Sequence, residues 1–202
     1  MVPASPTLTP AMMSILPLQR PRATWLCLLA VTLAGAGCQL SPNTPKELHA
    51  QVLDDFQSGG GMNREALARQ AERYRLVHDW HAAGTLVSAD DSFWASAALV
   101  TSDDPADLTL ARDLALMAAE LGDKRGFIVQ AEATDRLLMI QAKPQRYGTQ
   151  YIFEPVHQRW KLYPVDPLTS DIERRAFLIP PLAELMRDVE ELNAALPKDE
   201  DE

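Results

Sequence analysis

Cysteine is nearly absent from this chain, which has 202 residues and only two cysteines, Cys27 and Cys38. The long segment after Cys38 has none, which excludes a disulfide framework and a cysteine-based metal site there. Phosphate-binding loops, dinucleotide fingerprints, His-Glu-x-x-His and serine-nucleophile motifs are also missing. The sequence therefore predicts no cofactor and no metal site.

Positive charge is scarce as well. The chain has 19 basic and 28 acidic residues, for a net charge of −9. Of the charged residues, only Arg20 and Arg22 precede Cys38, so the segment from Cys38 onward carries a net charge of about −11. An acidic surface repels phosphate backbones and anionic lipid headgroups. We therefore expect no nucleic-acid partner and no membrane adhesion through charge alone.

No hydrophobic run is long enough to cross a bilayer as a helix, which takes about 20 residues. The longest run covers 11 residues, 24–34, after Arg20 and Arg22 and before the small residues 35–37. A positive start, a short apolar centre and a small-residue cleavage site are typical of a secretory signal. We assign 1–37 as the signal peptide, with translation starting at Met1, Met12 or Met13.

The end of this segment reads Leu-Ala-Gly-Ala-Gly-Cys over 33–38 and resembles the bacterial lipoprotein signal. It differs from that signal at Gly35, where leucine is usual. The resemblance implies a diacylglycerol on the Cys38 thiol and a further acyl chain, such as palmitate, on its amine. Several acyl chains anchor a protein to a membrane essentially irreversibly. Gln39, in place of aspartate, implies an outer-membrane lipoprotein facing the periplasm. The alternative is an ordinary secretory signal in which Cys38 is incidental.

The rest of the chain reads as a single, mainly α domain. We predict a tether at 38–62, a helical domain at 63–196 and an acidic tail at 197–202. Hydrophobic periodicity and capping signals predict a compact bundle of five to seven helices with one two-stranded β-hairpin near the C-terminal end, at about 147–163. The helices are expected at 46–57, 64–83, 92–100, 105–121, 127–142, 170–177 and 182–196.

Four expectations concern the helices themselves. Asp90 or Asp91 is expected to cap the third helix, and Asp104 before Pro105 the fourth. Alanines in the fourth helix allow a neighbour to approach closely. The apolar faces are expected to contain Leu67, Ala71, Tyr74, Val77 and His81 in the second helix, Leu110, Leu114, Met117 and Leu121 in the fourth, and Ile128, Ala131, Leu138 and Ala142 in the fifth.

The stretch 143–150 separates the helical pattern from the strands, and it carries a second resemblance. Residues from about 90 to 185 resemble an uncharacterised bacterial family, a domain of unknown function. That resemblance brings an architecture and no established activity. Its motifs in this chain are Asp135-Arg136-Leu137-Leu138, Pro144-Gln145-Arg146-Tyr147-Gly148-Thr149-Gln150, Trp160, Asp166-Pro167, Arg174-Arg175 and Pro180-Pro181-Leu182-Ala183-Glu184.

Asp135 is the most interesting single residue, because its helical position directs the carboxylate toward the core. A buried charge must be paired, hydrogen-bonded or protonated. In one interpretation Asp135 is a general acid or base beside Tyr147 and Gln150. In the other it ties the helix to the turn, with Gly148 supplying a special backbone geometry. The candidate partners are Arg136, Arg174, Arg175 and the backbone amides of 147–150, including Thr149.

Other polar residues have two interpretations each. Gln145 and Gln150 either read a polar ligand or satisfy loose backbone groups at the turn. His78 and His81 either begin a metal site that needs a third ligand, or His81, on the apolar face, is a packed and hydrogen-bonded histidine. We expect a non-catalytic, lipid-anchored binding module whose partner is an envelope protein or a cell-wall component. The alternative is a small hydrolase-like enzyme that uses Asp135 with Tyr147 and Gln150.

Overall fold

The structure, a computed structural model, describes residues 42–57 and 64–196. The signal peptide, Cys38, the two ends of the tether (38–41 and 58–62) and the acidic tail lie outside these residues. The described elements are α1 (Pro45–Gln57), α2 (Arg64–Ala82), α3 (Ala89–Leu99), α4 (Pro105–Glu120), α5 (Arg125–Ile140), β1 (Tyr151–Glu154), β2 (Arg159–Leu162), α6 (Asp171–Ala176) and α7 (Leu182–Ala194). The prediction of a mainly α fold with one hairpin is confirmed.

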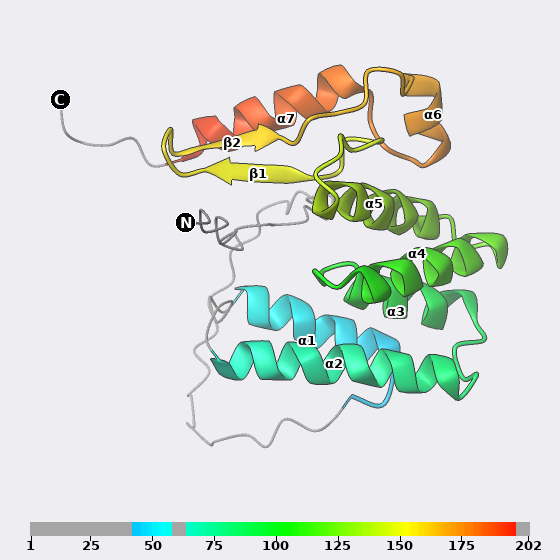
Figure 1. Cartoon of the computed structure of the whole chain (residues 1–202). Helices are drawn as coiled ribbons and strands as arrows, with labels where there is room; N and C mark the ends of the chain where they lie inside the picture. Colours follow the sequence, from blue (N-terminus) through cyan, green and yellow to red (C-terminus); the bar gives the residue numbers. More distant parts are fainter. Residues whose placement is uncertain (1–41, 58–63, 197–202) are drawn as a thin grey trace, which may run out of the picture.

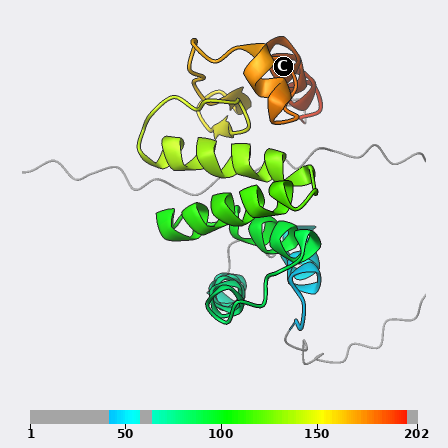
Figure 2. The same cartoon turned by 90° about the vertical axis from the view of Figure 1, so that its right-hand side faces the viewer.

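The elements stack in layers (Figures 1 and 2). Helices α1 and α2 lie at one end, α3, α4 and α5 occupy the middle, and the hairpin, α6 and α7 form the other end. α4 packs against both α3 and α5, while α7 packs against β2. Within the described residues no helix is long and apolar enough to cross a membrane.

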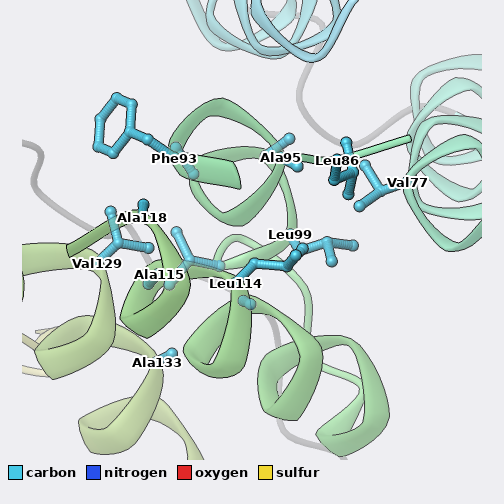
Figure 3. Close-up of a cluster of buried hydrophobic side chains, with 14 of the residues drawn as sticks. Val77, Leu86, Phe93, Ala95, Leu99, Leu114, Ala115, Ala118, Val129 and Ala133 are labelled. Carbon is cyan, nitrogen blue, oxygen red and sulfur yellow. The ribbon is translucent and has the colours of Figure 1, made fainter. Parts of the chain in front are cut away.

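The main hydrophobic core joins α1 to α5 (Figure 3). Its centre is rich in small residues, and Ala111, Ala115 and Ala118 of α4 are completely buried or nearly so. A Cβ atom added at Gly126 of α5 would lie 2.2 Å from the carbonyl oxygen of Ala115. The predicted close approach of a neighbour to the alanines is thus confirmed.

The capping predictions have mixed outcomes. Asp104 caps α4, with Pro105 as its first residue, as expected. The capping box formed by Ser170 and Glu173 also opens α6 as its spacing indicates. The predicted cap of α3 is wrong, because Ser88 accepts a hydrogen bond from the backbone N–H of Asp91 and starts the helix earlier.

In the predicted apolar faces the central residues are buried or half-buried and several marginal residues are exposed, while the side chain of Leu67 lies outside the described residues. In α2, Ala71 and His81 are exposed, because the helix turns Arg73 inward to pair with Asp55 of α1 at 2.7 Å. Leu121 after α4 and Ala142 after α5 are also exposed, since each lies beyond the end of its helix.

The hairpin has an apolar and a polar face. Phe153 of β1 lies opposite Trp160 of β2, and their ring centroids are 5.3 Å apart. The backbone N–H of Trp160 donates to Asn193 Oδ1 (2.7 Å), and Asn193 Nδ2 donates to the Trp160 carbonyl (2.9 Å). One side chain of α7 thus satisfies both backbone groups of Trp160 on the outer edge of β2. Leu162 packs against a second, smaller hydrophobic cluster.

Candidate functional site

Asp135 lies in the last part of α5, one turn and a half before the helix ends at Ile140. The chain then turns back, since Ala142 adopts a left-handed φ of 56° and Lys143 N–H donates to the Leu138 carbonyl at 2.9 Å. This reversal brings the segment 145–150 over the buried side chain of Asp135. We call Asp135 and residues 145–150 the Asp135 turn.

The Asp135 carboxylate has no exposed surface and is surrounded by donors. Its Oδ1 accepts from the backbone N–H groups of Arg146 (2.7 Å) and Tyr147 (2.9 Å). Its Oδ2 accepts from the N–H groups of Gly148 (2.9 Å) and Thr149 (3.0 Å) and from the Thr149 hydroxyl (2.9 Å). Four consecutive amides and one hydroxyl therefore converge on one carboxylate.

Opposing influences act on this carboxyl group. Burial raises the pKa of Asp135 above its ordinary value, while hydrogen bonds from Thr149, Tyr147 and Arg146 act to lower it. All five groups can donate, and an ionised carboxylate accepts from all of them without a proton of its own to place. The turn is therefore built to hold Asp135 in its ionised form.

Gly148 has the special geometry that was expected. Its φ is 95°, and a Cβ atom added there would lie 2.7 Å from Leu185 Cδ1 of α7. A side chain would strain the backbone as well as crowd α7. Glycine allows the amide at this position to face Asp135 while α7 packs close behind.

Gln145 satisfies backbone groups, as one of its two interpretations proposed. Its Nε2 donates to the carbonyls of Gln150 (2.9 Å) and Tyr163 (2.8 Å), and its Oε1 accepts from Gln150 N–H at 2.8 Å. Its backbone N–H bonds the Pro164 carbonyl at 2.9 Å. The buried Gln145 side chain therefore continues the hairpin ladder where its two strands separate.

The predicted arginine partners of Asp135 contact other groups. Arg174 is buried and donates to the Tyr147 carbonyl (3.1 Å) and the Thr169 carbonyl (2.9 Å), so it supports the turn from behind. Arg136 donates to the Ser102 carbonyl at 2.7 Å and pairs with Asp103 at 2.7 Å. Arg175 is exposed and bonds the Asp171 carbonyl.

The structure brings Asp135, Tyr147 and Gln150 together, although not as reacting groups. Tyr147 meets Asp135 through its backbone amide, and its ring lies 4.5 Å from that of Phe177. Gln150 Nε2 donates to Thr149 Oγ1 at 3.1 Å and to the Glu132 carbonyl at 3.4 Å. This arrangement suits a structural clamp, because proton transfer to a substrate requires a carboxylate within reach of it.

Sequence reasoning missed Glu132, which lies one helical turn before Asp135 and Arg136 and is also buried. Its Oε2 has no hydrogen-bond partner among the described residues. Burial, reinforced by the negative charge of Asp135, raises the pKa of Glu132 to about 8. Its spacing of three residues from Asp135 was the signal that could have revealed it.

Sequence reasoning also missed a hydrogen-bonded series of three side chains, His78, Asp107 and Ser102. Asp107 Oδ1 lies 2.6 Å from His78 Nε2, and the Ser102 hydroxyl donates to Asp107 Oδ2 at 2.7 Å. The carboxylate stands between the histidine and the serine, whereas an activated serine needs the histidine beside it. These hydrogen bonds instead join α2 to the start of α4. His81, the other half of the suggested metal pair, is exposed.

Metal binding receives no support from the described residues. Across 42–57 and 64–196, histidine, cysteine, aspartate and glutamate form no group of three or more that could hold an ion.

Searches of family models, curated proteins and solved structures find no match for this chain. The resemblances described from the sequence therefore stay predictions.

Proposed function

We propose that this protein is a lipid-anchored, non-catalytic binding module of the bacterial cell envelope. In this proposal Cys38 carries the acyl chains, the protein faces the periplasm from the outer membrane, and the helical domain binds an envelope protein or a cell-wall component. The cysteine that directly follows a signal-like segment supports the anchor.

One observation carries the non-catalytic part of the proposal. The Asp135 carboxylate, which was the best candidate for a general acid or base, is enclosed and receives five hydrogen bonds from its own turn. The Asp135 turn thereby fixes the hairpin, α6 and α7 on the helical bundle. We infer that its role is to present these elements in a fixed arrangement for recognition.

The anchor is tested by mass spectrometry of the mature N-terminus and by fractionation of cell envelopes. The wild type is expected to carry acyl chains on Cys38 and to sediment with the outer membrane, whereas Cys38→Ser is expected to stay soluble in the periplasm. An unacylated mature wild-type protein would contradict the proposal.

Catalysis is tested with Asp135→Asn, which keeps the shape of the side chain and removes its charge. We expect circular dichroism to show a lower melting temperature, and ester hydrolysis by the wild type to stay at the buffer rate. If the variant melted like the wild type, and if it lost a hydrolytic activity that the wild type possessed, the hydrolase alternative would be correct.

A further inference from the structure

Helix α6 and its two flanks expose three large aliphatic side chains. Leu168 is 87% exposed, Ile172 75% and Leu178 50%. Single exposed aliphatic residues are ordinary, but these three fall within eleven consecutive residues, Ile172 in α6 and the two leucines on either side of it. Exposed apolar groups gathered in this way are typical of interaction surfaces. We call α6 with Leu168 and Leu178 the α6 surface.

Leu178 also has an unfavourable backbone conformation. It follows the end of α6 with a φ of 60°, where its N–H bonds the Arg175 carbonyl (3.0 Å) and Ile179 N–H bonds the Arg174 carbonyl (2.9 Å). This type of helix end usually has glycine at that position. Because the leucine side chain is half exposed, burial within this chain does not offset the strain. Strained positions of this kind concentrate at functional sites.

The α6 surface is held rigidly from behind. The buried Arg174 bonds the carbonyls of Tyr147 and Thr169, so the helix rests on the Asp135 turn. Asp171, the first residue of α6, accepts from the Leu182 N–H of α7 at 2.9 Å. A surface that is already ordered loses little entropy when a partner binds.

The charges around this surface indicate the kind of partner. From 166 to 196 the chain has seven carboxylate residues and three arginines, and one of these arginines, Arg174, is buried. α7 exposes four carboxylate residues, Glu184, Asp188, Glu190 and Glu191, against one arginine, Arg187, so its exposed side is acidic on balance. Electrostatic complementarity therefore favours a partner with basic residues beside an apolar stripe.

The position of the surface favours a protein over a lipid bilayer. The α6 end of the stack lies opposite residues 42–44, where the described chain enters α1 (Figures 1 and 2). Six residues lie between Cys38 and Pro45, so the Cα atoms of these two residues can be at most about 25 Å apart. If Cys38 is the anchor, as the proposed function has it, α1 and α2 lie nearest to the membrane and the α6 surface faces the periplasm.

We propose that the α6 surface docks a basic, amphipathic segment of another envelope protein. The aliphatic side chains of Leu168, Ile172 and Leu178 contact the apolar stripe of that segment, and the acidic residues of α7 face its basic side. This inference deepens the proposed function by naming the binding surface and the chemistry of the partner.

The test uses the mature chain with Cys38→Ser and a labelled 18-residue peptide of leucine and lysine arranged with a helical period. A peptide of the same composition in scrambled order is the matched probe. Fluorescence anisotropy is expected to show preferential binding of the amphipathic peptide. We expect Ile172→Ser and Leu178→Gly each to weaken this binding at least tenfold.

Two controls separate binding from folding. Val87→Ser removes an aliphatic side chain that is 72% exposed between α2 and α3, and it is expected to leave binding unchanged. Leu178→Gly removes the strained backbone conformation, so its melting temperature is expected to equal or exceed that of the wild type. A variant that folds at least as well and binds more weakly identifies a docking residue.

Several results would overturn the proposal. The first two are equal binding of the two peptides and unchanged peptide binding in Ile172→Ser and Leu178→Gly. The other two are preferential binding of the wild type to vesicles of phosphatidylglycerol and phosphatidylcholine, and self-association of the wild type that Ile172→Ser abolishes. The peptide measurement does not involve the lipid. Its failure is therefore distinguishable from a failure of the anchor, which mass spectrometry of Cys38 reports.

Discussion

The bundle α1–α5 and the segment 144–196 are held in different ways. The bundle shares one continuous apolar core, whose members are mostly alanine, leucine and valine. The segment 144–196 shares with Ala131 of α5 a cluster of only four buried hydrophobic residues, and residues 146–150 donate hydrogen bonds to Asp135 and to the Glu132 carbonyl of α5. Polar contacts therefore largely determine how the segment 144–196 is positioned on α5.

This difference predicts different responses to substitution. An apolar core loses stability in proportion to the volume removed, because its neighbours relax partly into the space. A buried polar network fails more abruptly, since removing one acceptor leaves several donors without partners in a dry environment. Substitutions in the bundle and in the segment 144–196 should therefore have distinguishable effects on stability.

The largest effect is expected for Asp135→Ala. The substitution leaves five donors without their acceptor, and each unsatisfied buried group costs about 1–3 kcal/mol. We expect a loss of about 5 kcal/mol or local unfolding of the segment 144–196. Amide hydrogen exchange measures this directly: protection is expected to disappear over 145–163 and to persist in α3 and α4.

Leu114→Ala in α4 is the matched contrast, with an expected cost of about 2–5 kcal/mol spread over the whole bundle. In this variant, hydrogen exchange should rise in α3, α4 and α5 together. If Asp135→Ala instead raised exchange uniformly, the two regions would form one cooperative unit and the distinction would fail.

Partial recovery of Asp135→Ala in formate would show that the four amides still accept an anion.

The next effect concerns Glu132 and pH. Its pKa is raised to about 8 in the folded protein, whereas an unfolded glutamate titrates near its ordinary value. Between these values the folded state holds a proton that the unfolded state has lost, so stability falls as pH rises. Glu132→Gln removes this dependence. From pH 5 to pH 7 its stability relative to wild type should increase by about 2–3 kcal/mol.

Urea unfolding at several pH values provides the measurement. Burial lowers the pKa of His49, which acts in the opposite direction, but His49 titrates in both proteins and cancels in the difference. Glu190→Gln, at an exposed position of α7, serves as the control and should follow the wild type. Parallel curves for Glu132→Gln and wild type would show that Glu132 is ionised in the folded protein.

Most of the fold could be predicted from the sequence because local signals coincide there. Asp104 before Pro105, the pair Ser170 and Glu173, and the change of period at 143–150 each mark a boundary by short-range chemistry. The orientation of helix faces was less predictable. Burial of Arg73 depends on Asp55 of another helix, and no periodicity within α2 reports that partner.

In the candidate site, too, local features were predictable and contacts between distant segments were not. Burial of Asp135 and the role of Gly148 follow from the helix period and from the chemistry of a turn. The identity of the partner groups depended on the path of the chain, which placed Arg136 beside Asp103 and left the amides of 146–149 to face Asp135. The bond between Asn193 and Trp160, 33 residues apart, had no local signal at all.

That bond gives the smallest expected effect and the finest test of how the C-terminal end is held. Asn193→Ala removes both hydrogen bonds to Trp160 and exposes the outer edge of β2, at an expected cost of about 1–2 kcal/mol. Because α7 also packs through Leu185 and Val189, the helix should stay folded. Hydrogen exchange is expected to rise at Trp160 while the Asp135 turn stays protected. If protection at 146–149 were lost as well, the hairpin edge and the turn would be one cooperative structure, and the polar attachment would depend on α7 as much as on Asp135.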